Sequence, residues 1–434
     1  MYKLEFTLKQ HTPIIHFQHD QDGATLRASE VKPKLDRFII EKSGGNDLAR
    51  RNFPHWFINE KHNALNYKIR ITASEKENSL NELINLTIGK NDYGEKKPVY
   101  KNLPGFFGNM MKVEEFENNE KPLKKVSFYN KICFNVITQN LDLKSTIDNY
   151  IADFFLENNF GTRQTKGFGS FTIINKNPGS TGLAYFTLDY GRNQFERIFS
   201  DIDLFYRTLK SGLNIKTKNK DGKLVDKLYF KSLMFKYAKK LSPSEQWDKR
   251  TIRHALYIDD WKYKNDTSKA GILNLRTEKN GTVQYAPSKS REGNYYDFRD
   301  LLGLSSEQDW LFYKNKKVTK KVTDNKNVEI ERFHSPILFK PIYDGTKEMW
   351  FIFIILNPIP DSYLGAEVEV KNKSNSVNLT IFPSFKISEY LKFAIKEYDV
   401  EDFEFGEGFS FENTDEAYVI DNIYDQLKNQ QKYE

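Results

Sequence analysis

The sequence predicts an α+β protein with two domains. Short strands are mixed with amphipathic helices in both halves of the 434-residue chain. In residues 1–174 the order is strand, helix, helix, glycine-rich loop and strand, which fits a ferredoxin-like unit. The stretch Asn177-Pro178-Gly179-Ser180 is typical of a linker. We therefore expect one domain over residues 1–178 and a second over residues 179–434.

The first strand is predicted over residues 2–9, where apolar Tyr, Leu and Phe alternate with polar residues. A helix follows and extends to about Ile40. Because proline is best tolerated in the first turn of a helix, Pro33 indicates that this helix begins near Ser29 or later.

A second helix is predicted from Ser145, with Asp148 completing an approximate capping box, to Asn158. Its apolar residues recur at the spacing of one helical face. A glycine-rich loop, Gly161–Gly169, connects it to a strand expected at Ser170–Ile174.

The second half contains two turn signals that predict β-hairpins, Asp221-Gly222 and Asp344-Gly345. Further helices are expected at Arg250–Tyr257 and Ser388–Lys396. Two polar, lysine-rich segments, 260–290 and 313–328, are expected to be long surface loops inserted in this domain.

Charge is distributed unevenly along the chain, although the net charge is only +7. Residues 207–253 hold 14 Lys or Arg against 4 acids, whereas residues 397–425 hold 11 acids and no Lys or Arg. A basic middle and an acidic end favour a polyanion site or an acidic partner surface. The alternative is a solvated helix face together with a solubilising tail.

Several protein classes are excluded by composition. The single cysteine, Cys133, cannot form an internal disulfide or a multi-cysteine metal site, and its apolar neighbours predict a buried thiol. The longest apolar run, Trp350–Leu356, is far too short to span a bilayer, and no N-terminal hydrophobic signal is present. We expect a soluble, cytoplasmic protein with no membrane association.

The histidines of the N-terminal region suggest two kinds of catalytic chemistry. His16 and His19, near Asp20 and Asp22, have a spacing that fixes no coordination geometry, so we expect no metal. Metal-free RNA cleavage needs an acid and a base at the scissile phosphate. His11 or His16 could serve beside Lys32, but no second group is paired with them in the sequence.

The glycine-rich loop is the most informative element. Glycines allow backbone amides to approach a phosphate, and Arg163 and Lys166 add positive charge. Phe168 could stack on a base or close the core. A dinucleotide site has a strand before such a loop and a helix after it, and this chain has the reverse order, so we expect no nucleotide cofactor. The alternative is a glycine hairpin with incidental charge. The candidate RNA-binding residues of the loop are Gly161, Arg163, Lys166, Gly167, Phe168 and Gly169.

Two further basic segments are candidates for RNA contacts. The first predicted helix carries Arg27, Lys32, Lys34 and Arg37, of which the last two share a helix surface. In the second segment, lysines and arginines interleave with aromatic residues, as they do in single-strand grooves. Both segments could equally be solvated helix faces. The candidates of the second segment are Lys236, Lys239, Lys240, Arg250 and Arg253.

Two motifs together resemble the RAMP superfamily of CRISPR-associated proteins. The run Gly161–Phe171 is similar to the glycine-rich loop of subunit one of the Cmr complex, which has the form Gly-x-Arg-x-(Arg/Lys)-(Arg/Lys)-Gly-Phe-Gly-Ser. The runs Thr12-Pro13-Ile14 and Thr25–Lys32 resemble the end of the first RAMP strand and the start of the first helix. Softer matches are found at Phe205–Gly212 and Arg332–Pro336.

The resemblance implies tandem ferredoxin-like domains in a non-catalytic subunit of a type III-B effector of antiviral defence. Such a subunit holds the guide RNA near its 3′ region, contacts target RNA and assembles with other Cmr and RAMP proteins. The catalytic RAMP subunit of these complexes uses an Asp in the loop after the first strand, where Asp20 and Asp22 lie. An endoribonuclease, acting on repeat or target RNA with or without such an Asp, is therefore the alternative. A third reading is a protein scaffold whose acidic tail, Glu397–Asp425, binds a basic neighbour.

Overall fold

The chain forms two compact units, each built from helices and strands. The structure is a computed structural model that describes residues 1–15, 25–76, 86–90, 96–100, 128–179, 182–241, 252, 256, 295–309, 317–372 and 376–431. Unit 1 comprises Met1–Phe205, Leu338–Ile355 and Val419–Glu434, and unit 2 comprises Tyr206–Ile337 and Leu356–Tyr418. The predicted α+β class is confirmed. The predicted domain boundary at 178/179 stays a prediction.

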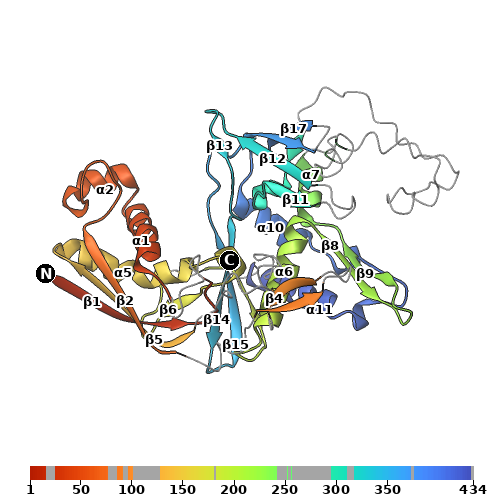
Figure 1. The fold of residues 1–434 in the computed structure, drawn as a ribbon, viewed down its shortest axis with the longest axis horizontal. Coiled ribbons are helices and arrows are strands. Elements are labelled where there is room, and N and C mark those ends of the chain that lie inside the picture. The colour runs from red at the N-terminus through yellow and green to blue at the C-terminus, as the bar shows by residue number, and fades with distance from the viewer. Residues whose placement is uncertain are drawn as a thin grey trace. The chain divides into compact units, whose positions relative to one another are not determined.

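The N-terminal part of unit 1 is a ferredoxin-like fold, as predicted. Its elements are β1 (Tyr2–Gln10), α1 (Ala28–Lys42), β2 (Tyr67–Lys76), β5 (Tyr129–Thr138), α5 (Leu141–Glu157) and β6 (Phe171–Ile173). The strands pair antiparallel in the order β2-β5-β1-β6. Helices α1 and α5 pack on one face of this sheet (Figure 1), where the alternating apolar residues of β1 and β5 form the core with them.

Short elements occupy the connection between α1 and β5. They are α2 (Asn46–Asn52), the 3₁₀ helix η1 (Pro54–Trp56) and the hairpin of β3 (Leu86–Lys90) and β4 (Lys96–Tyr100).

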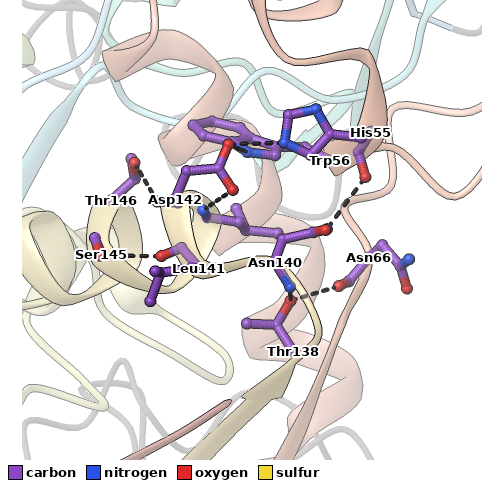
Figure 2. A network of polar contacts seen from close by, with 10 residues as sticks. His55, Trp56, Asn66, Thr138, Asn140, Leu141, Asp142, Ser145 and Thr146 are labelled. Atoms are coloured by element: carbon purple, nitrogen blue, oxygen red, sulfur yellow. Dashed lines mark hydrogen bonds and ion pairs between the residues drawn. The ribbon is translucent and has the colours of Figure 1, made fainter. Parts of the chain in front are cut away.

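A polar network at the start of α5 explains why this helix begins four residues before the predicted Ser145. Figure 2 shows Asp142 in the first turn, where its Oδ2 accepts from Trp56 Nε1 at 2.8 Å and contacts His55 Nε2 at 2.7 Å. An acid in this position is favoured by the helix dipole. The Ser145 hydroxyl donates to the Leu141 carbonyl within the helix at 3.0 Å, so the predicted capping box is wrong. The first helix begins at Ala28, one residue before the earliest predicted start, and Pro33 lies inside it rather than in its first turn, so the prediction from the proline is wrong.

A second set of elements follows the order strand, helix, strand, strand, helix and makes up the second ferredoxin-like fold, whose sheet has three strands among the described residues. It consists of β7 (Tyr185–Leu188), α6 (Phe195–Lys210), β14 (Ile337–Asp344), β15 (Met349–Leu356) and α11 (Asp415–Gln431). The strands form the sheet β14-β15-β7. Phe205 of α6 packs on Phe186 and Tyr424 with ring centroids 5.5 and 5.2 Å apart. The predicted hairpin at Asp344-Gly345 is confirmed.

Unit 2 is formed by the chain between α6 and β14 and between β15 and α11. One sheet has the order β10-β17-β16-β12-β11, with β13 paired to β12, and another has the order β18-β9-β8. The elements are β8 (Leu213–Lys218), β9 (Leu224–Phe230), α7 (Leu233–Leu241), β10 (Tyr296–Asp297), η5 (Arg299–Leu302), β11 (Glu307–Asp309), β12 (Lys317–Thr323), β13 (Glu329–Ile330), β16 (Glu367–Lys371), β17 (Ser376–Ile381), α10 (Ile387–Glu397), η6 (Val400–Asp402), β18 (Phe403–Phe405) and η7 (Phe411–Asn413).

The predictions for this half are confirmed in part. The hairpin at Asp221-Gly222 joins β8 to β9, and α10 covers the predicted helix at Ser388–Lys396. The loop expected at 313–328 is wrong for Lys317–Thr323, which is strand β12. The predicted loop 260–290 lies outside the described residues, as does all of the predicted helix Arg250–Tyr257 except Ile252 and Leu256.

Within the described part of the chain, no helix has the length and apolar character needed to cross a bilayer. Nor do the described residues bring three potential metal-binding side chains of His, Cys, Asp or Glu together. Cys133 on β5 is only half-buried, because its side chain alternates with the buried Ile132 and Phe134 and faces the opposite side of the sheet. The expected buried thiol is therefore wrong.

Candidate nucleic-acid interface

The glycine-rich loop between α5 and β6 is anchored by its own backbone. The amide of Gly161 donates to Glu30 Oε1 of α1 at 2.6 Å, and that of Gly169 donates to the Pro13 carbonyl at 2.8 Å. The amide of Gly167 donates to the Gln164 carbonyl at 3.2 Å. The expectation that glycine amides are available to a phosphate is therefore wrong for these three residues.

Close packing explains why these positions are glycines. A Cβ on Gly169 would lie 1.8 Å from the Phe160 carbonyl oxygen, and one on Gly161 would lie 2.8 Å from the Ile15 carbonyl oxygen. Both residues have positive φ, at 66° and 81°, which other residues rarely adopt. The glycines shape the loop, and contact of their surface with RNA stays a prediction.

Phe168 is fully buried and stacks on Phe199 of α6, with ring centroids 4.4 Å apart and planes inclined by 22°. Of the two roles that the sequence allowed, the structure shows closure of the core. A base cannot stack on a ring that is covered in this way.

The tip of the loop presents the two predicted cations. Arg163, with φ 57°, precedes the single 3₁₀ turn η3 (Gln164–Lys166), so the cations stand at its two ends. Both side chains are partly exposed. Lys166 Nζ lies 3.3 Å from Asp203 Oδ1, and its side chain is 39% exposed. An ion pair at that exposure contributes little stability, so a phosphate can compete for the lysine.

The predicted lysines of α1 serve mainly within the protein. Lys34 Nζ donates to the Asn159 carbonyl at 2.8 Å and to Gln164 Oε1, which ties the helix to the loop. Burial lowers the pKa of Lys34. Lys32 Nζ donates to Asp36 Oδ2 at 2.8 Å and to a backbone carbonyl. Arg37 is exposed and Arg27 is half-buried, so these two are the better placed for a ligand.

Lys340 is a residue that sequence reasoning missed. Its fully buried Nζ donates to the carbonyls of Asn158 and Phe171, both at 2.8 Å, on the two sides of the loop. Burial, reinforced by the charge of Lys34, holds the pKa of Lys340 well below its usual range. The available signal was a lone lysine in the apolar run Ile337–Ile342.

The basic and aromatic segment of unit 2 is a folded core rather than an open groove. Tyr237 of α7 is buried among Phe385, Tyr390 and Phe393, with centroid distances of 5.0–5.8 Å. Lys239 is half-buried and Lys240 is exposed, with its ammonium 5.0 Å from the Phe393 ring. The described aromatic residues of α7 thus support the alternative of a helix face over an aromatic core, while Arg250 and Arg253 lie outside the described residues.

The uneven charge of the chain is partly neutralised within unit 2. Lys236 Nζ donates to the Asp402 carboxylate, and Lys227 Nζ lies 2.7 Å from Glu416 Oε2. The basic middle thus pairs with the acidic end of the same chain. The acidic segment is folded, with Phe403 buried in β18, and is not a free tail over its described length.

His11 is buried and uses both ring nitrogens. Nε2 lies 2.8 Å from Thr172 Oγ1, and Nδ1 accepts from the Tyr343 amide at 3.1 Å. Burial, with the charges of Lys9, Lys340 and Arg192, holds the pKa of His11 well below its usual range. A neutral, enclosed imidazole does not fit an acid or base of RNA cleavage. The other histidines and acids considered for chemistry, His16, His19, Asp20 and Asp22, lie outside the described residues.

Family models match both halves of the chain. The Cmr1 N-terminal domain matches residues 1–213, and the Cmr1 C-terminal domain matches residues 229–416. The chain belongs to the Cmr1 family. The resemblance based on the glycine-rich loop is thereby confirmed. Cmr1 proteins are subunits of the type III-B Cmr effector complex. A comparison with curated proteins gives no significant match.

Proposed function

We propose that this Cmr1 chain binds RNA without cleaving it, holding the guide RNA near its 3′ region and contacting target RNA in antiviral defence. The observation that carries the proposal is the loop tip, where Arg163 and Lys166 stand at the two ends of one 3₁₀ turn. Two cations on a fixed backbone suit a sugar–phosphate chain, which is recognised by charge and not by sequence.

The anchoring of the loop supports this role. Glu30 of α1 binds the loop backbone at Gly161, and Lys34 of α1 and Lys340 of β14 bind the backbone just before the loop, at Asn159 and Asn158. Such a support reduces the conformational entropy lost when a side chain of the tip binds a phosphate. Arg37, exposed on α1, extends the cationic surface that we assign to RNA.

The test is RNA binding by the assembled complex carrying the double variant R163Q/K166Q. Affinity should fall about equally for all RNA sequences, and the salt slope should fall by about 0.7 for each lost phosphate contact. The matched control is R51Q/K61Q, which removes the same charge from two exposed residues of unit 1. Equal affinities of the two double variants would remove the proposal.

The absence of cleavage is a separate part of the proposal. The enclosed state of His11 supports it, because an essential base must reach the 2′-hydroxyl that it deprotonates. The purified chain should leave repeat RNA and guide-paired target RNA intact, with and without a divalent metal. Cleavage that is abolished in D20N, D22N or H16Q would establish the endoribonuclease instead.

A further inference from the structure

A pocket in unit 1 combines cations with aromatic rings, and none of its lining residues is a predicted RNA-binding residue. Its volume is about 280 Å³, and Lys9, Tyr129, Asn130, Arg192 and Tyr343 are among the residues that line it. They come from β1, β5, the segment before α6, and β14. The volume lies just below the common range for small-ligand sites, roughly 300–1,000 Å³, so the pocket admits one small ligand.

The pocket holds an excess of positive charge. Partial burial, followed by the charge of Arg192, lowers the pKa of Lys9, and the charge of Asp344 opposes this shift. The charges of Lys9 and Arg192 also lower the pKa of the adjacent buried His11. Lys9 Nζ has a long contact, 3.3 Å, with the Tyr343 carbonyl. Lys9 and Arg192 line the same pocket, so an anion that binds between them is attracted by both charges.

Groups suited to a planar polar ligand lie beside these cations. Tyr129 and Tyr343 are half-buried, and the Tyr343 ring is supported by Trp350 with centroids 5.2 Å apart. Asn130 is exposed at the pocket wall and supplies both a donor and an acceptor. Base stacking on an aromatic ring is tolerant of sequence, whereas an amide side chain can bond to a base edge.

We propose that this pocket binds one nucleoside phosphate, with the phosphate between Lys9 and Arg192 and the base against Tyr129 or Tyr343. The choice of a ribonucleotide rests on the proposed function in RNA binding. An acidic peptide would use the cations but not the two tyrosine rings, so the nucleotide accounts for more of the lining. The ligand can be a unit of an RNA strand or a free nucleotide, and these share the chemistry that the pocket recognises.

The test uses the full-length chain and a hexauridylate labelled with 5-iodouridine, which crosslinks to aromatic residues on irradiation. Crosslinks should map to the peptides that contain Tyr129 or Tyr343. K9Q and R192Q should each weaken binding about tenfold, as expected for the loss of one charged hydrogen bond. The matched control is K3Q, which removes the same charge from an exposed lysine six residues earlier on β1.

Uridine monophosphate distinguishes the two sources of the ligand. If it displaces the crosslink from either tyrosine, the pocket takes a free nucleotide. If only unlabelled hexauridylate does so, the pocket takes a unit of a strand, and both results support the inference. Absence of crosslinks at both tyrosines, with K9Q binding like K3Q, would overturn it. In that case RNA binding that still depends on Arg163 and Lys166 would leave the proposed function intact.

Discussion

Lys340 in unit 1 and Lys320 in unit 2 are both fully buried, but their surroundings are opposite in charge. Lys340 donates to two carbonyl oxygens. Lys320 lies between two carboxylates, with Nζ 2.7 Å from Asp297 Oδ2 and hydrogen-bonded to Asp300. The comparison shows that a buried lysine can have hydrogen-bond acceptors without having an opposite charge beside it. Lys340 has carbonyl acceptors, whereas Lys320 has carboxylates.

The titration of the neighbouring groups follows from this difference. Burial lowers the pKa of Lys340, and among the described residues no carboxylate opposes this shift. Around Lys320, burial alone would raise the pKa of Asp297, but the lysine's charge holds that pKa below its usual range. Burial and the charge of Asp297 raise the pKa of Asp300 to about 6. Lys320 therefore binds two carboxyl groups, and Asp300 holds its proton more strongly than Asp297 does.

The largest effect is expected for K320M, which removes the ammonium that is hydrogen-bonded to both buried carboxylates. Removing one partner of a buried ion pair costs about 3–5 kcal/mol of unfolding free energy. Urea unfolding of the full chain at pH 7, followed by circular dichroism, measures this loss. The matched control is K321M on the next residue, whose side chain is 56% exposed and should change stability by less than about 0.5 kcal/mol. Similar losses for the two variants would break the comparison.

A pH dependence that belongs to Asp300 is the next largest effect. Its pKa is about 6 in the folded protein and ordinarily 3.8, so the folded state binds more protons between these values. The stabilisation is therefore present below about pH 4 and is lost as the pH rises through 6, by up to about 3 kcal/mol. Unfolding free energies of wild type and D300N should diverge across pH 4–7. Parallel curves would show that Asp300 does not titrate in this range.

K340M should cost less than K320M at pH 7, about 1–3 kcal/mol, because it leaves two neutral carbonyls unpaired and no buried charge. The unfolded chain binds the lysine proton more strongly than the folded chain, so wild-type stability rises as the pH increases toward 10.5. The difference between wild type and K340M should therefore widen from pH 7 to pH 10. A narrowing difference would contradict the lowered pKa.

The smallest effect is expected for K34M, about 1 kcal/mol, since this side chain is 24% exposed and water replaces part of its bonding. Its removal also takes away the neighbouring charge that lowers the pKa of Lys340. The unfolding free energy should thus rise less between pH 7 and pH 10 in K34M than in wild type. K42M, on the same helix with a surface partner, serves as the control and should keep the wild-type slope.

Periodicity was sufficient to predict the first ferredoxin-like fold, because β1 has one buried face and α5 an apolar stripe. The loop motif predicted the family. It did not predict that the amides of Gly161 and Gly169 form hydrogen bonds within the protein. Their acceptors, Glu30 and Pro13, are far away in sequence and come close only in the folded chain. Sequence could not identify Lys320 as buried either. Its segment is lysine-rich, and its carboxylate partners are 20 and 23 residues away along the chain.

The interruption of the second ferredoxin-like fold has a consequence for synthesis on the ribosome. The first sheet is complete once β6 has emerged, because all four of its strands precede residue 174. By contrast, β7 at Tyr185–Leu188 pairs with β15 at Met349–Leu356, so it must wait while the intervening chain is translated. Closing so long a loop is slow. The nascent chain therefore carries an unpaired strand edge for much of its elongation, an exposure that nascent-chain chaperones are suited to cover.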